Sequence, residues 1–125
     1  MKGKKVRIVS FLVAAATCLL VVILQYKMNV MQNHYWVCHL LFGFGFTYLV
    51  VGLFDSFKIA SAFTLVWSFG NELIQDHLDK LSVNPNAEYV VNWDHLAADI
   101  AGWVIALICW LVVSRIASGH ESNRV

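Results

Sequence analysis

Acidic and histidine side chains occur inside or beside the apolar segments of this sequence, where ionisable groups are rare. Glu72 and Asp99 each lie at least one turn inside apolar sequence, and carboxylates at such places usually face the interior of a helix bundle. Histidine and carboxylate side chains also bind zinc, manganese and magnesium in proteins. We therefore expect a polar, ligand-binding and metal-binding site whose candidate residues are His39, Glu72, Asp76, His95 and Asp99.

The spacing of four of these residues places them in pairs. Glu72 and Asp76 are four residues apart, and so are His95 and Asp99. Side chains at this separation project from one face of a helix. Each pair is thus expected to present two ligand groups to the same neighbouring helices.

Two glycines accompany the candidate site. Gly43 follows His39 by four residues and Gly102 follows Asp99 by three. Glycine lets the backbones of two membrane helices approach closely. We therefore expect Gly43 and Gly102 to be helix-packing positions around the polar site.

The composition indicates the kind of element that must position these residues. Of 125 residues, 59% are hydrophobic and only 14% are charged, whereas soluble domains carry about 25% charged residues. The length suits a single domain over residues 1–125. The net charge of +1 gives no reason to expect nucleic acid as a partner. The sequence predicts a small integral membrane protein.

Four apolar segments are long enough, or nearly so, to cross a bilayer, which takes about 20 residues of helix. They cover residues 6–25, 37–54, 59–74 and 96–114. We therefore predict an all-α membrane protein built as a bundle of four transmembrane helices. The basic start of the first segment is also typical of a signal peptide. Its apolar run continues through Leu24, however, so we expect a retained helix.

The basic residues predict the orientation, because lysine and arginine concentrate on the cytoplasmic side of membrane proteins. With four spans, seven of the nine basic residues fall on one side and only Lys27 and Lys80 on the other. Both termini are therefore expected in the cytoplasm. The loops over residues 26–36 and 75–93, with the candidate site beside them, are expected to face the outside.

Two stretches, "NELIQD" and "NWDHLAADIAG", resemble motifs of known bacterial membrane families. YfiM-like proteins carry Lys-Glu-x-x-x-Asp and then Ser-Trp-x-Asp-Leu-x-x-Asp-x-x-Gly, and VanZ-like proteins carry Glu-x-x-Gln and then Asp-x-x-x-Asn-x-x-Gly. The resemblance spans roughly residues 35–110. The positions that match are His39, Gly43, Glu72, Leu73, Ile74, Gln75, Asp76, Trp93, Leu96, Asp99 and Gly102.

One position departs from both patterns, because His95 stands where these families usually place an aspartate and Asp94 precedes it. A family role for that carboxylate therefore does not transfer directly. VanZ-like proteins are associated with resistance to glycopeptide and lipoglycopeptide antibiotics. The resemblance implies a protein of the bacterial inner membrane with a cell-envelope role and a pocket facing the periplasm.

Three functions are compatible with these residues. We expect an accessory protein that binds a lipid headgroup or an envelope precursor, with a divalent metal cation able to bridge carboxylates to phosphate. The first alternative is a metal-dependent membrane hydrolase, although no dedicated catalytic signature occurs. The second is a structural subunit, in which the polar residues form hydrogen bonds between helices and the partner is another membrane protein.

Overall fold

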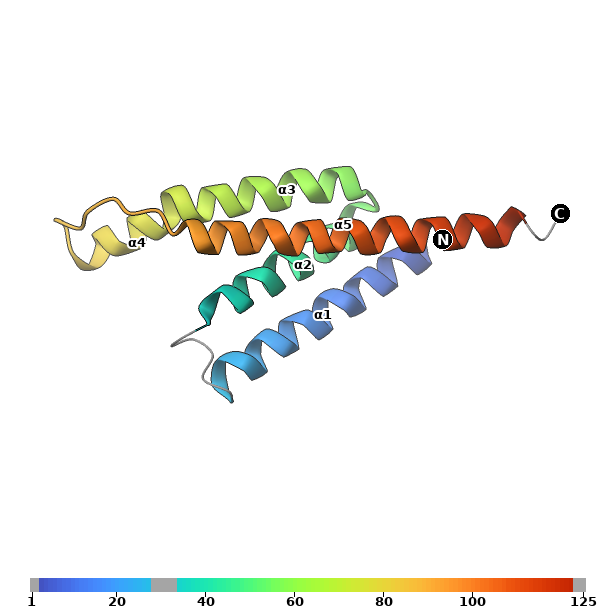
Figure 1. Ribbon diagram of the computed structural model, residues 1–125, viewed down its shortest axis with the longest axis horizontal. Coiled ribbons are helices and arrows are strands. Elements are labelled where there is room, and N and C mark those ends of the chain that lie inside the picture. The colour runs from blue at the N-terminus through green and yellow to red at the C-terminus, as the bar shows by residue number, and fades with distance from the viewer. Residues whose placement is uncertain (1–2, 28–33, 123–125) are drawn as a thin grey trace.

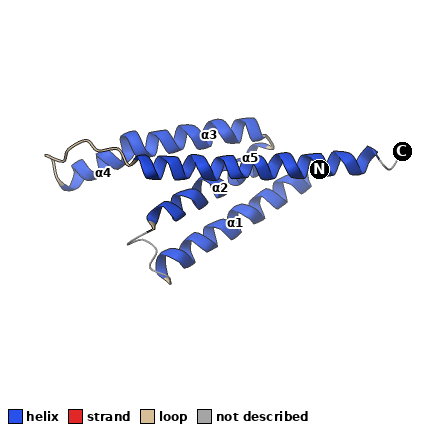
Figure 2. Ribbon diagram, in the orientation of Figure 1, coloured by secondary structure: helices blue, strands red, loops and turns tan. Residues whose placement is uncertain are grey.

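The computed structural model describes residues 3–27 and 34–122, and this part of the chain consists of helices and short connections without any strand (Figures 1 and 2). The prediction of an all-α fold is confirmed. The elements are α1 (Lys4–Tyr26), α2 (Tyr35–Phe54), α3 (Phe57–Gly70), the π-helical turn η2 (Asn71–Gln75), α4 (Asp76–Val83) and α5 (Trp93–Ser122).

Three of these helices are long and apolar enough to cross a membrane. Their most apolar windows have mean hydropathies of 2.6 in α1, 2.0 in α2 and 2.3 in α5. Helix α3 has 14 residues, fewer than the roughly 20 that a crossing takes. The described helices therefore contain three membrane-type spans, and α3 falls short of that length by itself.

The helical backbone does not end where the third apolar segment was predicted to end, at residue 74. It passes from α3 through η2 into α4 and ends at Val83, because residues 70, 71, 75 and 76 all keep right-handed helical backbone angles. Helix α4 is polar, and its Asp76–Lys80 pair at a separation of four residues supports it. The polar residues of α4 therefore end the apolar segment, but the helix continues through them.

Helix α2 is the centre of the bundle and packs against α1, α3 and α5. A tight turn leads from it into α3. Asp55 adopts the left-handed conformation (φ 52°) that commonly ends a helix, and its N–H donates to the carbonyl of Val51 (2.8 Å). The hydroxyl of Ser56 then caps α3 by accepting from the N–H of Ile59 (3.4 Å). The turn reverses the chain and lays α3 antiparallel to α2.

The apolar core lies near this turn. It consists of Val6, Val50, Val51 and Ala60, with Phe46, Phe57 and Trp110 packed against it. Polar side chains join the helices beside the core: Thr47 and Thr64 share a hydrogen bond of 3.0 Å between their hydroxyls. Such bonds between helices contribute modestly to the stability of membrane bundles. The core thus packs against the second half of α2, whereas the first turns of α2 contact the polar site.

The chain direction brings distant segments together at the other end of the bundle. The start of α1 and the end of α5 lie toward one end, whereas the start of α2, the end of α3 and the start of α5 lie toward the opposite end, near α4 (Figure 1). His39 lies near the start of α2, Glu72 lies in η2 directly after α3, and His95 lies near the start of α5. The topology therefore gathers the candidate residues at the end away from both termini.

Candidate metal site

Two glycines bring α2 and α5 into close contact beside the candidate residues. A Cβ atom added to Gly43 would collide with the backbone carbonyl of Asp99, and one added to Gly102 would collide with that of Leu40. Only glycine permits helix backbones to approach this closely. The contact places His39 of α2 directly opposite the first turns of α5.

The imidazoles of His39 and His95 stack on one another. Their ring centroids are 4.4 Å apart and the ring planes differ by 17°. The ring of Tyr35, one turn before His39 on α2, meets both imidazoles edge-on, at centroid distances of 5.0 and 5.2 Å. The histidine side chains are 12% and 27% exposed respectively. The stack fixes the plane of both rings before any ligand arrives.

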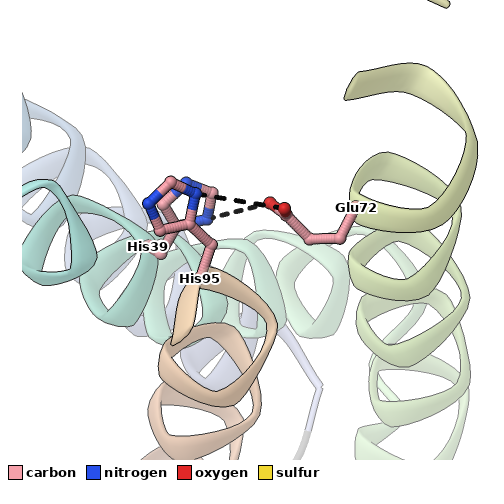
Figure 3. A group of neighbouring side chains, drawn as sticks. All are labelled: His39, Glu72 and His95. Atoms are coloured by element: carbon pink, nitrogen blue, oxygen red, sulfur yellow. Dashed lines mark ion pairs between the residues drawn. The ribbon is translucent and has the colours of Figure 1, made fainter. Parts of the chain in front are cut away.

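Glu72 faces this stack from the π-helical turn, as Figure 3 shows. Its side chain is only 2% exposed, and Oε1 accepts a hydrogen bond from the amide of Asn71 (3.2 Å). Oε2 has no hydrogen-bond partner among the described residues. A buried carboxylate oxygen without a partner is costly, and π turns frequently occur at functional sites. Glu72 therefore requires a further partner.

The carboxylate of Asp99 closes the group on the α5 side. Its side chain is 1% exposed, and Oδ1 lies 3.1 Å from Nδ1 of His39. This distance is within the range of a hydrogen bond, which the histidine donates when Nδ1 carries the proton. His39 thus stands between two buried carboxylates, those of Glu72 and Asp99.

The distances from Glu72 to the histidines fit metal ligands better than hydrogen bonds. Oε1 lies 3.6 Å from Nδ1 of His39, and Oε2 lies 3.9 Å from Nδ1 of His95. Hydrogen bonds between nitrogen and oxygen are mostly about 2.7–3.2 Å long, so both contacts are long for hydrogen bonds. A tetrahedral ion with bonds of about 2.1 Å holds its ligand atoms about 3.4 Å apart. One ligand atom from each of His39, Glu72 and His95 lies within 4.8 Å of the others.

Asp76 takes other partners in the structure. Its carboxylate pairs with the ammonium of Lys80 at 2.6 Å and accepts from the amide of Asn92 at 3.3 Å. Its side chain is 29% exposed. Of the five predicted site residues, the structure therefore gathers His39, Glu72, His95 and Asp99, and it does not bring Asp76 into that group. The lysine one turn further along α4 is the competing partner.

Two residues that contact the site were not predicted from the sequence. Tyr35 is not among the predicted candidates, yet its ring contacts both imidazoles. Its position four residues before His39 was the available signal, because that spacing shares a helix face. Asn71 directly precedes Glu72, and its amide reaches the carboxylate from within the π turn. The apolar pattern contains no signal for that turn.

A cavity of about 230 Å³ opens beside the group. His39 and Asp99 line it together with the polar side chains of Gln25, Tyr35 and Asn71. At about 30 Å³ for each water molecule, this is room for roughly seven waters or one small polar group. The histidine and carboxylate cluster is thus accessible to a ligand from one side.

Comparison of this chain with known protein families, with curated proteins and with solved structures gives no significant match.

Proposed function

We propose that this protein is an integral membrane protein that binds a divalent transition-metal ion at one end of a helical bundle. His39, Glu72 and His95 supply two imidazole nitrogens and a carboxylate, a set that zinc takes in proteins. The single observation that carries the proposal is the carboxylate of Glu72. It is 2% exposed, leaves one oxygen without a hydrogen-bond partner in the described part of the chain, and faces two histidine nitrogens.

Asp99 is the fourth ligand in this proposal. Its Oδ1 lies 3.1 Å from the ligand nitrogen of His39, near the separation of about 3.4 Å between tetrahedral ligands. An ion bound at Nδ1 of His39 would displace a proton from that nitrogen to solvent and leave the carboxylate of Asp99 free to act as a ligand. The two negative charges of Glu72 and Asp99 would offset the two positive charges of zinc.

A binding role is favoured over hydrolysis by the position of Asp99. Catalytic zinc keeps one coordination position open for water, whereas a structural ion takes four protein ligands. His39, Glu72 and His95 already hold ligand atoms within 4.8 Å of one another, and Asp99, which contacts His39, is the proposed source of the fourth. We therefore favour an accessory protein whose metal-containing pocket binds a membrane ligand over a metal-dependent hydrolase.

For the membrane arrangement we propose four crossings with both termini in the cytoplasm. Residues 57–75 of α3 and η2 would extend about 28 Å, close to the hydrocarbon thickness of about 30 Å. The positive-inside tendency supports the orientation. The end that carries the termini holds Lys4, Lys5, Arg7, Lys58 and Arg115 of the described residues, against Lys27 and Lys80 at the site end.

The resemblance to VanZ-like and YfiM-like proteins supports a place in the bacterial inner membrane with the pocket toward the periplasm. Glu72, Asp99 and Gly102 carry that resemblance, and all three lie at the candidate site or its helix contact. We propose membrane lipids or a cell-envelope precursor as partners. Their headgroups lie at the depth where such a pocket would open.

Elemental analysis of protein purified in mild detergent tests the metal proposal. After exposure to zinc and gel filtration, wild type should retain about one zinc ion per chain, as expected for one four-ligand site. Glu72→Gln and His95→Ala should lose it. Glu88→Gln and His34→Ala are matched controls at exposed positions and should retain it. Zinc retention by Glu72→Gln equal to wild type would refute the site.

A further inference from the structure

The polar cavity does not end beside the cluster but adjoins an apolar groove. A second cavity of about 480 Å³ runs between α1 and α2, and Val21 and Phe42 line both spaces. The groove is lined by apolar side chains such as Phe11, Ala14 and Leu49. Together the two spaces fall within the range of roughly 300 to 1,000 Å³ that ligand pockets occupy.

The groove is apolar along its length although a threonine lines it. Thr17 donates its hydroxyl hydrogen to the carbonyl of Val13 (2.8 Å) within α1, so its polar atom is already satisfied. Beside it, a Cβ atom on Gly45 would come within 3.0 Å of the Thr17 side chain. Close packing at this point holds α1 to α2 and leaves the groove alongside. Such a lining suits a hydrocarbon chain.

Among the described residues, no lysine or arginine lines the cavity above the groove. Its polar groups are the amides of Gln25 and Asn71, the hydroxyl of Tyr35, the imidazole of His39, the thiol of Cys38 and the carboxylate of Asp99. Phe42 and Trp67 add aromatic rings, 6.4 Å apart between centroids. Phosphate groups are bound mainly by arginine and lysine. Amides, a carboxylate and aromatic faces instead suit a neutral headgroup with several hydroxyls.

We propose that the cavity and the groove form one binding site for a lipid whose headgroup is a neutral, hydroxyl-rich group such as a sugar. The headgroup lies against Gln25, Tyr35 and Asn71, and one hydrocarbon chain passes Phe42 into the groove between α1 and α2. The assignment rests on the proposed metal site, because zinc offsets the charges of Glu72 and Asp99 and makes the cavity electrically neutral. A neutral cavity does not attract a cationic headgroup by charge.

Native mass spectrometry of the zinc-loaded full chain tests this proposal. The protein is purified in a polyoxyethylene detergent, which carries no sugar, and mixed with equal amounts of three lipids that share the same acyl chains. These are a glucosyl diacylglycerol, phosphatidic acid and phosphatidylcholine. Wild type should retain the glucosyl lipid about tenfold better than either phospholipid, which is the effect of roughly one or two hydrogen bonds.

Two pairs of variants separate the site from lipid bound generally around the protein. Ala14→Trp fills the groove, whereas Ala16→Trp makes the same change two residues away, outside it. Gln25→Leu removes a headgroup amide, whereas Gln75→Leu removes an exposed one that bonds Asp79. The first variant of each pair should lose the preference for the glucosyl lipid, and the second should keep it.

The outcomes distinguish this proposal from the metal proposal when zinc is measured in the same samples. Zinc retained with equal binding of all three lipids, or with no effect of Ala14→Trp, would overturn the lipid site and leave the metal site standing. Preferential retention of phosphatidic acid would overturn the choice of headgroup. Selective retention of the glucosyl lipid by protein that holds no zinc would contradict the metal site instead.

Discussion

His39 and His95 come from different helices, yet their imidazoles lie parallel at a centroid distance of 4.4 Å and both direct Nδ1 toward the carboxylate of Glu72 (Figure 3). The contact between α2 and α5 at Gly43 and Gly102 sets this arrangement. Stacking holds the two nitrogens on the same side of the pair. The relationship connects helix packing to the proposed metal chemistry.

Zinc binding should weaken as the pH is lowered. A histidine must release its proton before its nitrogen can bind a metal ion, and two histidines are ligands here. Protonation therefore competes with zinc, so the affinity for zinc falls as the pH is lowered. Titration of the purified protein with zinc should show at least about tenfold weaker binding near pH 5.5 than near pH 7.5. An affinity that does not change would indicate a site without histidine ligands.

Enlarging Gly43 should disrupt both the bundle and the site. The side chain in Gly43→Leu has no space, because even a Cβ atom would meet the backbone of Asp99. We expect overpacking to lower the free energy of unfolding by about 1–3 kcal/mol, together with loss of zinc. Thermal unfolding in detergent and zinc content are the measurements. Gly119→Leu is the control, since nothing lies within 4 Å of a Cβ atom there.

Should Gly43→Leu unfold at the wild-type temperature and retain zinc, the close approach of α2 and α5 is not needed for the site. Gly43→Ala is a milder variant, which adds only the Cβ atom that meets the backbone of Asp99. It should lie between wild type and leucine in both measurements. A graded series would show that helix separation, and not leucine itself, causes the loss.

Substitutions of Asp99 should separate its shape from its charge. Asp99→Asn keeps an oxygen near His39 and should remain folded, with zinc binding weakened because a neutral amide no longer offsets the charge of the ion. Asp99→Leu removes both side-chain oxygens and should weaken zinc binding further than Asp99→Asn does. The variant should still insert into the membrane. Glu72→Gln should be the more damaging amide replacement, because Glu72 faces both histidines. Competition with a zinc chelator gives these affinities.

Equal affinities in wild type and Asp99→Leu would remove Asp99 from the ligand set. Full zinc binding by both Glu72→Gln and Asp99→Leu would leave only the structural role, in which the polar residues stabilise the bundle through hydrogen bonds.

The orientation is tested by cysteine labelling in a background without the three native cysteines. Ser82 lies in α4 at the site end and Ser118 lies in α5 at the end with the termini. Because basic residues concentrate at the latter end, Ser82→Cys should react with an impermeant reagent added to spheroplasts, and Ser118→Cys should react only after lysis. Reaction of both from outside, or the reverse order, would contradict the proposed topology.

The sequence predicts the helical class because apolar side chains dominate runs long enough for membrane helices, and three helices of that kind are present. It does not predict the full length of the helical stretch that begins at Phe57. Asp76, His77 and Asp79 end the apolar run, whereas backbone hydrogen bonds and the Asp76–Lys80 pair continue the helix to Val83. Helix α4 buries none of its residues fully and is polar on average, so no long apolar run marks its extent.

The chemistry of the site is only partly visible in the sequence. Residue types and spacing point to His39, Glu72, His95 and Asp99, which the structure gathers. Residue type and spacing also point to Asp76. In the structure its carboxylate is bound by Lys80 and Asn92 instead, and the sequence pattern does not show that competition. The stacking of His39 on His95 depends on how α2 and α5 cross, and a pattern along one chain does not contain that angle.

The most direct test of the metal site is X-ray absorption spectroscopy at the zinc edge on protein loaded with one ion per chain. The proposed ligands predict four nitrogen and oxygen neighbours at about 2.0–2.2 Å, with the outer-shell scattering of two imidazoles. Cys38 lines the same cavity, so the nature of the ligand atoms is a real question. A sulfur neighbour at about 2.3 Å, or no imidazole scattering, would contradict the account.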